Sequence, residues 1–299
     1  MQLFSNHLAL LANNIHQLYG ERGICWIKDL PEIIAEVASL HHLSQLKPLN
    51  NLSYHYVLSG FQNQHPIILK LGFDQDSLKK EAAALQAFSG FGATSIRAEA
   101  PGWLLLERAV PADSLKTYFP VQDELAASVV CKVMRRLHQA PLQQAPFLTI
   151  DNWLSILNQD WDMDSHDLQQ ARLLRDHLLA TSAKPVLLHG DLHHDNILQN
   201  GNEWMVIDPK GIIGEPLFEI AAFLRNPMPE LMAHPEVGTI TQRRIQQFSD
   251  SLGCSYQRIA QWCFVQAVLA QIWALEDNLH HHLAYFKQLT DFFRGLLRL

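Results

Sequence analysis

The stretch that most constrains the fold is LLHGDLHHDNILQNGNEWMVIDP, residues 187–209. Two apolar runs, Pro185–Leu188 and Trp204–Ile207, predict short buried strands. The polar residues between these runs are His189, Asp191, His193, His194, Asp195 and Asn196. So many acid and imidazole groups between two core strands indicate a functional site.

The spacing of these polar residues predicts a chemistry. A loop of the form H-x-D-x-x-x-x-N, followed by a strand that ends in Asp, is the arrangement that phosphoryl transfer uses. Here Asp191 would orient and deprotonate a hydroxyl, while Asn196 and Asp208 would hold Mg²⁺ on nucleotide phosphates. Because the transferred phosphoryl group needs positioning and charge neutralisation more than covalent help, these three side chains form a nearly sufficient catalytic set. His189 would brace the loop.

Two other interpretations use the same residues. Asp and Asn are common in turns, and Asn200–Gly201 is a hairpin signal, so a polar loop between strands needs no function. Alternatively, the letters H-x-D-x-H-H-D offer ligands to a zinc hydrolase that activates water. The zinc interpretation has no further convincing ligand cluster downstream, and it leaves Lys70 and Glu81 without a role.

Composition limits the class of protein. The chain has 299 residues, 48% of them hydrophobic, which is enough for one large or two ordinary globular domains. The net charge of −7, without a basic cluster, argues against a nucleic-acid partner and is compatible with a cationic substrate. The N-terminus lacks the basic and apolar segments of a signal peptide or membrane anchor. We therefore expect no membrane partner. The 4 cysteines lack C-x-x-C spacing, so we expect free thiols and a cytoplasmic location. No feature indicates an oligomeric state.

The N-terminal region, residues 1–43, predicts two packing helices. The first has apolar residues at helical spacing and stops at Gly20 and Gly23. The second follows Asp29–Leu30–Pro31, where Asp can cap and Pro is tolerated, and runs to about Leu43.

From Ser44 to about Glu107 the hydrophobic period becomes that of strands. Five runs predict strands, at Leu46–Leu49, Tyr54–Leu58, Ile67–Leu71, Ser95–Ala98 and Trp103–Leu106. One helix, starting near Asp76 or Ser77 and ending at Gly90, follows the third run. A small antiparallel sheet with one helix is typical of the nucleotide-covering lobe of a kinase.

Two charged residues lie where such a lobe needs them. Lys70 is part of the apolar third strand, where an unpartnered ammonium is costly, and Glu81 is on the following helix. A pair between them would hold the ammonium against the α- and β-phosphates of a nucleotide. In the alternative interpretation Lys70 reaches solvent from a sheet edge, and Glu81 is one of several charges on an exposed helix face.

The nucleotide contacts are predicted from position. Because residues 50–54 contain no Gly, phosphate contacts there must come from backbone N–H groups and the Ser53 hydroxyl. Residues 107–111 predict a hinge, in which the backbone of Glu107 and Ala109 would meet an adenine edge. An ordinary linker between lobes is the alternative.

Beyond the hinge the pattern is mostly helical. Helices are predicted over residues 122–138, 151–161, 166–180, 215–225, 239–252 and 255–298, the last with a break near 278. Glu215 and Glu219 follow the second metal carboxylate and are candidates for the substrate pocket. The sequence therefore predicts an α+β chain with packing helices over 1–43, a nucleotide-covering lobe over 44–108, and a helical lobe over 109–299 that carries the catalytic loop.

The two motifs HGDLHHDNIL and VIDPKGIIGEPLFEIAAFLRNP resemble the small-molecule kinases of the aminoglycoside phosphotransferase superfamily. The second is similar to the streptomycin 6-phosphotransferase and hydroxyurea-resistance branch. This resemblance implies a protein-kinase-like fold of two lobes and ATP-dependent O-phosphorylation of a small molecule. By motif it implies that Asp191 is the general base, that Asn196 and Asp208 bind Mg²⁺, and that Lys70 and Glu81 position phosphates. Asp195 stands where such loops often have Gly.

We therefore expect an ATP- and Mg²⁺-dependent kinase that phosphorylates a hydroxyl of a small cationic acceptor. The expected acceptor is an aminoglycoside or aminocyclitol such as streptomycin, in an antibiotic-resistance role. A kinase for homoserine, choline or a sugar, and a nucleotide-binding protein without turnover, are the alternatives.

Overall fold

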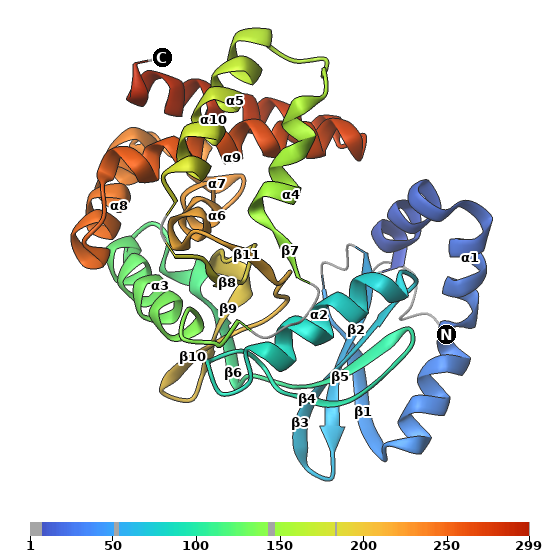
Figure 1. The fold of residues 1–299 in the computed structure, drawn as a ribbon. Helices are drawn as coiled ribbons and strands as arrows, with labels where there is room; N and C mark the ends of the chain where they lie inside the picture. The colour runs from blue at the N-terminus through green and yellow to red at the C-terminus, as the bar shows by residue number, and fades with distance from the viewer. Residues whose placement is uncertain (1–7, 51–53, 143–146, 183, 299) are drawn as a thin grey trace. The chain divides into compact units, whose positions relative to one another are not determined.

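The computed structural model describes residues 8–50, 54–142, 147–182 and 184–298 (Figure 1). Its contacts divide the chain into two units. Unit 1 comprises Met1–Ser89 and Ala93–Ala112, and unit 2 comprises Gly90–Gly92 and Asp113–Leu299.

The sheet of unit 1 contains the five strands that the sequence predicts. In spatial order these are β1 (Leu43–Pro48), β2 (His55–Gln62), β3 (His65–Gly72), β5 (Trp103–Glu107) and β4 (Ile96–Ala100). All neighbouring pairs are antiparallel. Because side chains alternate across a strand, β3 presents Leu69 and Leu71 to one face of the sheet and Ile68 and Lys70 to the other.

Each face of this sheet is covered by a helix. Helix α1 (Leu8–Leu40) packs its Leu11, Ile15 and Leu30 against the face that includes Leu69 and Leu71. Helix α2 (Gln75–Ala87) contributes buried side chains to a second cluster with Ile68, Leu104 and Leu106. The carboxylate of Asp74 caps α2 by accepting hydrogen bonds from two backbone N–H groups of its first turn. Lys70 therefore lies on the face that α2 covers.

The predicted boundary of the second N-terminal helix is wrong. The two helical segments of α1 meet at Gly20, where φ is 58° and ψ is −143°, and the second segment includes Pro31 instead of beginning there. Gly23 also lies within this segment. A Cβ at that position would stand 2.5 Å from Cγ2 of Ile15. The glycine permits close packing and does not end the helix. Strand β1 already begins at Leu43.

Unit 2 is mostly helical, as predicted. Its helices are α3 (Asp123–Leu137), α4 (Ile150–Leu154), α5 (Ser165–Ala180), α6 (Ile220–Leu224), α7 (Glu230–Ala233), α8 (Val237–Leu252), α9 (Tyr256–Glu276) and α10 (His280–Leu297). Short 3-10 turns precede or follow several of them: η2 (Leu115–Tyr118), η3 (Ser155–Asn158), η4 (His194–Asn196) and η5 (Pro216–Glu219). The sequence did not predict α7.

Two small sheets frame the polar loop of unit 2. One has the order β10 (Glu203–Val206), β9 (Ile197–Asn200), β6 (Pro111–Ser114), and the other the order β7 (Leu148–Thr149), β11 (Ile212–Gly214), β8 (Val186–Leu188). Strands β8 and β10 are the two apolar runs of the sequence, and the predicted turn at Asn200–Gly201 joins β9 to β10. The loop from β8 to η4 carries the predicted catalytic residues.

Helix α9 is the core helix of unit 2. It packs against α5, α6, α8 and α10. Among the described residues it is the helix long and apolar enough to cross a membrane, but 78% of its apolar window is buried inside the protein. Its apolar surface therefore serves packing within the unit. The buried thiols of Cys131 and Cys263 are free, as the sequence predicts.

Candidate active site

Hydrogen bonds tie the loop after β8 to the segment after β10. Ring atom Nε2 of His189 lies 2.8 Å from the carbonyl oxygen of Ile207. The N–H of Ile207 donates to the carbonyl of Asn196 at 3.1 Å, and the N–H of Lys210 donates to that of His189 at 2.7 Å. The segment that carries Asp208 is thereby held beside the loop that carries the other predicted catalytic residues.

His189 braces this loop, as the sequence predicts. Its side chain is fully buried, and its second ring nitrogen, Nδ1, accepts the backbone N–H of Asp191 at 3.2 Å. Burial lowers the pKa of His189. A neutral ring fits both contacts, because one nitrogen donates to the Ile207 carbonyl while the other accepts.

The carboxylate of Asp191 is held by a cation from a distant part of the chain. Nη2 of Arg225 donates to Oδ1 at 3.0 Å, and Nε2 of His193 lies 3.6 Å from Oδ2. Burial would raise the pKa of Asp191, but His193, Arg225 and Lys210 outweigh it and hold the pKa well below the usual range. The side chain keeps 28% of its surface exposed, so the ionised carboxylate remains accessible.

Arg225 is not among the site residues that the sequence predicts. This residue follows α6, and its Nη1 donates to Oε1 of Gln266 at 2.8 Å while its carbonyl accepts the hydroxyl of Tyr285 at 2.6 Å. These bonds fix the guanidinium that meets Asp191. The available signal was a cation directly after the apolar run Ile220–Leu224, since a partly buried cation in such a place needs a partner.

The two predicted metal ligands have the oxygen chemistry that Mg²⁺ prefers. The Nδ2 group of Asn196 donates to the carbonyl of Asp191 at 2.9 Å, which leaves Oδ1 as the ligand atom of a side chain only 8% exposed. Asp208 has a φ of 58°, a left-handed conformation that costs a non-glycine residue about 1–3 kcal/mol. Its Oδ2 lies 3.1 Å from Nζ of Lys210. Strain retained at an acidic residue in a clamped loop indicates a functional constraint.

Asp195, the departure from the usual glycine, lies at the surface of the loop. Its side chain is 51% exposed, and its Oδ2 lies 3.9 Å from Nδ1 of His193. The hydroxyl of Ser114 donates to the carbonyl of His194 at 2.9 Å and lies 3.5 Å from Oδ1 of Asp195. The added charge is therefore about half exposed to solvent.

Glu219 supports the catalytic loop through hydrogen bonds with its backbone. Its Oε2 accepts the backbone N–H of His189 at 2.7 Å, and its Oε1 accepts that of Gly190 at 2.9 Å. The Glu219 side chain has no exposed surface. A fully buried carboxylate cannot meet a substrate ammonium, so the predicted substrate contact is replaced by a structural role.

Glu215 is also occupied inside unit 2. It accepts two hydrogen bonds from Arg258, at 2.5 and 2.7 Å, and one from Nε1 of Trp262 at 3.0 Å. Its side chain is 2% exposed. The charge predicted to bind a cationic substrate is therefore already neutralised by Arg258.

In unit 1 the predicted ion pair is present. Nζ of Lys70 lies 2.6 Å from Oε2 of Glu81, and the two residues are 8% and 6% exposed. Burial of both partners excludes the alternatives of a snorkelling lysine and a solvated helix charge.

Of the other predicted nucleotide contacts, Glu107 is the last residue of β5. At Glu107 the N–H donates to Ser95 at 2.9 Å, and the carbonyl accepts the hydroxyl of Thr94 at 2.8 Å. A carbonyl has a second lone pair, so this oxygen can still accept another donor. Ala109 is buried, at 4% exposure. Ser53 lies outside the described residues.

A zinc-hydrolase site would need a cluster of protein ligands. Within the part of the chain that the structure describes, no three His, Cys, Asp or Glu side chains are grouped so as to hold a metal ion. Magnesium bound to a nucleotide needs only one or two protein oxygens besides the phosphates. Asn196 and Asp208 match that smaller requirement.

A small antiparallel sheet with a buried Lys–Glu pair, and a helical unit with an H-x-D-x-x-x-x-N loop, define a protein-kinase-like fold. The fold is similar to that of aminoglycoside phosphotransferase APH(4)-Ia in a ternary complex with ADP and hygromycin B. The TM-score is 0.68 at 14% identity, over 87% of this chain and 97% of that one.

The chain belongs to the aminoglycoside/hydroxyurea antibiotic resistance kinases, whose family model matches residues 44–278. Streptomycin 3''-kinase of Klebsiella pneumoniae is 30% identical over 231 residues, which cover 75% of this chain and 85% of that protein. Streptomycin 6-kinase of Streptomyces glaucescens is 25% identical over 280 residues, 90% of each. The protein is thus a small-molecule phosphotransferase that acts on hydroxyl groups, which confirms the predicted superfamily and fold.

Proposed function

We propose that this enzyme transfers the γ-phosphate of ATP, with Mg²⁺, to a hydroxyl of an aminoglycoside such as streptomycin, in an antibiotic-resistance role. The observation that carries the proposal is the clamped loop, in which Arg225 holds Asp191 at 3.0 Å beside the segment of Asp208. The streptomycin kinases among the relatives support the acceptor class. The ADP bound to the structural neighbour supports the nucleotide.

In this mechanism Asp191 is the general base. Its lowered pKa keeps it ionised, so it accepts a hydrogen bond from the acceptor hydroxyl and orients the oxygen towards the γ-phosphorus. A bond forms between that oxygen and phosphorus, the bond from phosphorus to the β–γ bridging oxygen breaks, and the hydroxyl proton passes to Asp191. ADP leaves with the bridging oxygen.

The remaining residues would position the nucleotide. Asn196 Oδ1 and the Asp208 carboxylate would hold Mg²⁺, which neutralises phosphate charge when bound. Lys70, fixed by Glu81, would contact the α- and β-phosphates. The backbone of Glu107 and Ala109 would meet the adenine edge, and the Ser53 hydroxyl would contact phosphate.

The acceptor is tested by coupled ATP consumption with Mg²⁺, comparing streptomycin with a blank that lacks acceptor. We expect streptomycin-dependent ADP formation, and we expect Asp208→Ala to lower it at least ~10²-fold because that variant removes metal-held charge stabilisation. If ADP forms only with homoserine, choline or a sugar, the proposed aminoglycoside acceptor is wrong. If ATP raises the melting temperature of the protein but no acceptor gives turnover, the protein binds nucleotide without catalysis.

Removing the guanidinium beside Asp191 should change the pH dependence of the reaction. With the cation present the pKa of Asp191 is lowered, so the carboxylate stays ionised as pH falls below the ordinary aspartate value of about 3.9. In Arg225→Met the pKa should rise, and the acid limb of kcat/KM should move to higher pH. Arg225→Lys should restore part of the shift. Arg172→Met, which changes an arginine bound to the Leu157 and Gln159 carbonyls, serves as the control. An unchanged acid limb in Arg225→Met would contradict this role.

A further inference from the structure

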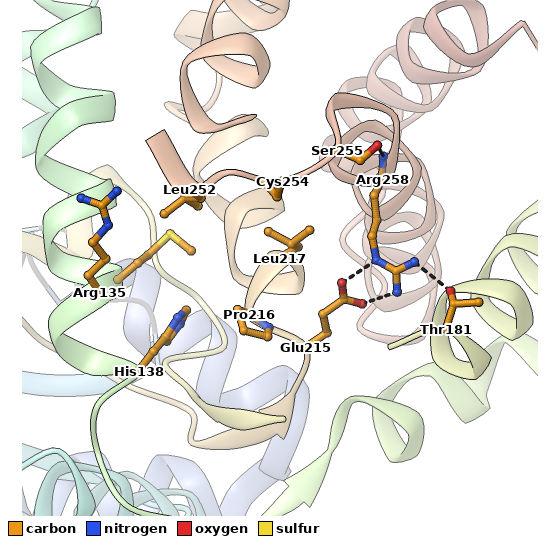
Figure 2. Close-up of a pocket in the computed structure, with 11 residues that line it drawn as sticks. Arg135, His138, Thr181, Glu215, Pro216, Leu217, Leu252, Cys254, Ser255 and Arg258 are labelled. Carbon is orange, nitrogen blue, oxygen red and sulfur yellow. Dashed lines mark hydrogen bonds and ion pairs between the residues drawn. The ribbon is translucent and has the colours of Figure 1, made fainter. Parts of the chain in front are cut away.

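Unit 2 contains a pocket of about 510 Å³ that the proposed reaction does not use (Figure 2). Its walls come from the end of α3, the start of η5, the α8–α9 connection and the first turn of α9. Its volume lies within the range of small-molecule sites, about 300–1,000 Å³. No residue of the 189–196 loop lines it.

The middle of this pocket is apolar. Met134, Pro216, Leu217 and Leu252 line it, and Figure 2 shows Leu217 between the α3 side and the Glu215 side. The Glu215 carboxylate at one end is paired with Arg258 at 2.5 and 2.7 Å, and Arg258 also donates to the Thr181 hydroxyl at 2.8 Å. That end of the pocket is therefore electrically balanced.

Arg135, at the opposite end, is exposed to solvent and forms no ion pair among the described residues. Its guanidinium donates to the neutral carbonyl of Ser251. Among the residues that the structure describes, no carboxylate lies within ion-pair distance of it. An apolar cavity with one solvated guanidinium at its edge suits a ligand with an apolar body and one anionic group, because a charge-assisted hydrogen bond to the anion would take the place of water.

The pocket is connected to the catalytic loop through η5. Pro216 and Leu217, which line the pocket, are the first half of this four-residue turn, and Glu219 is its last residue. The Glu219 carboxylate holds the N–H groups of His189 and Gly190. A ligand packed against Leu217 would therefore press on the turn that supports the loop.

A second connection runs through His138. This residue lines the pocket, and its Nε2 lies 3.6 Å from Oε2 of Glu219. Nε2 is buried and has no hydrogen-bond partner among the described residues. A small movement of the ring would bring Nε2 within hydrogen-bond distance of the carboxylate that holds the loop.

We propose that this pocket binds a small organic anion with an apolar body, such as a medium-chain carboxylate, and that occupancy changes turnover through η5 and His138. Binding and coupling are separate parts of the proposal. Binding is measured without turnover, so its failure is distinct from failure of the proposed function.

Binding is tested with three probes of equal length: octanoate, octylammonium and octanol. Cys254 lines the pocket, whereas Cys25 is exposed in unit 1 and serves as an internal control. Alkylation of both thiols by iodoacetamide is followed by mass spectrometry. Octanoate at ten times its Kd should slow labelling of Cys254 about tenfold, as expected from 1 + [L]/Kd, and leave Cys25 unchanged. Protection by octylammonium equal to that by octanoate would overturn the assignment of an anion.

Variants test the contribution of the Arg135 charge to binding separately from that of the cavity. Arg135→Gln should reduce protection by octanoate to the level of octanol, while Arg136→Gln, which changes a neighbouring arginine paired with Glu203, should not. Leu252→Trp should fill the cavity and abolish protection by both probes. Full protection in Leu252→Trp would place the ligand elsewhere and overturn the site.

Coupling is tested by kcat for ATP consumption at saturating octanoate. We expect kcat to change at least about twofold in the wild-type protein and to stay constant in Leu252→Trp, since allosteric couplings commonly exceed that factor. An unchanged kcat in the wild-type protein, with Cys254 fully protected, would overturn the coupling.

Discussion

Asp191→Asn is expected to lower kcat by about 10²–10⁴, the usual contribution of a general base, with little change in the KM for ATP. Asparagine keeps the size and polarity of the side chain, so the bond from Asp191 N–H to His189 and the loop geometry should persist. What is lost is the ionised oxygen that orients the acceptor hydroxyl and takes its proton. Steady-state kinetics with the best acceptor at saturating ATP provide the measurement.

Asp195→Asn is the matched control for this variant. It removes the same charge from the same loop, but at a side chain that is 51% exposed. Its effect on kcat should remain within a few-fold, since it removes no group assigned to the chemistry. Equal losses in the two variants would mean that loop charge in general, and not a base at Asp191, supports turnover.

The sequence predicted the structure wherever a local pattern of residues is compatible with only one arrangement. Short apolar runs separated by turn residues predicted all five strands of unit 1, because buried strands are short and turns punctuate them. Lys70 in an apolar strand predicted a carboxylate partner, since an unpaired buried ammonium is too costly, and Glu81 lies 2.6 Å away. The fixed spacing of Asp191 and Asn196 similarly predicted that both residues lie in one loop, where the Asn196 amide donates to the carbonyl of Asp191.

Contacts between distant segments could not be predicted in this way. Arg225 and Asp191 are 34 residues apart, and Arg244 and Asp123 are 121 apart, so no local period relates them. Glu219 shows the same limit. Its proximity to the motif indicated a site residue, but only the fold shows that its carboxylate faces backbone N–H groups of the loop.

Asp123→Ala is expected to destabilise unit 2 by about 3–5 kcal/mol, because it leaves a buried guanidinium without its partner. Arg244 has no exposed surface, and its Nε and Nη2 bond to both carboxylate oxygens of Asp123 at 2.5–3.1 Å. A loss of this size is a large part of the total stability of a typical domain, about 5–15 kcal/mol. Urea unfolding measures it.

Glu124→Ala supplies the comparison, since it removes an ion pair to Arg243 whose partners are 67% and 39% exposed. Exposed pairs contribute about 0–1 kcal/mol, so this neighbouring variant should unfold close to the wild type. The double variant Asp123→Ala with Arg244→Met should be more stable than Asp123→Ala alone, because the unpaired charge is gone. Similar losses in Asp123→Ala and Glu124→Ala would show that the buried pair is not a major source of stability.

The same pair connects stability to the catalytic loop. Nη1 of Arg244 donates to the carbonyl of Asn226 at 2.7 Å and lies 3.4 Å from that of Phe223, the residues that flank the Leu224–Arg225 step. Its guanidinium also stacks over the Phe223 ring, 4.7 Å from the centroid. Because Arg225 holds Asp191, loosening this turn should misplace the base. Asp123→Ala should therefore lower kcat under conditions where the protein is still folded, whereas Glu124→Ala should not. Unchanged kcat in folded Asp123→Ala would mean that Arg225 is held by Gln266 and Tyr285 alone.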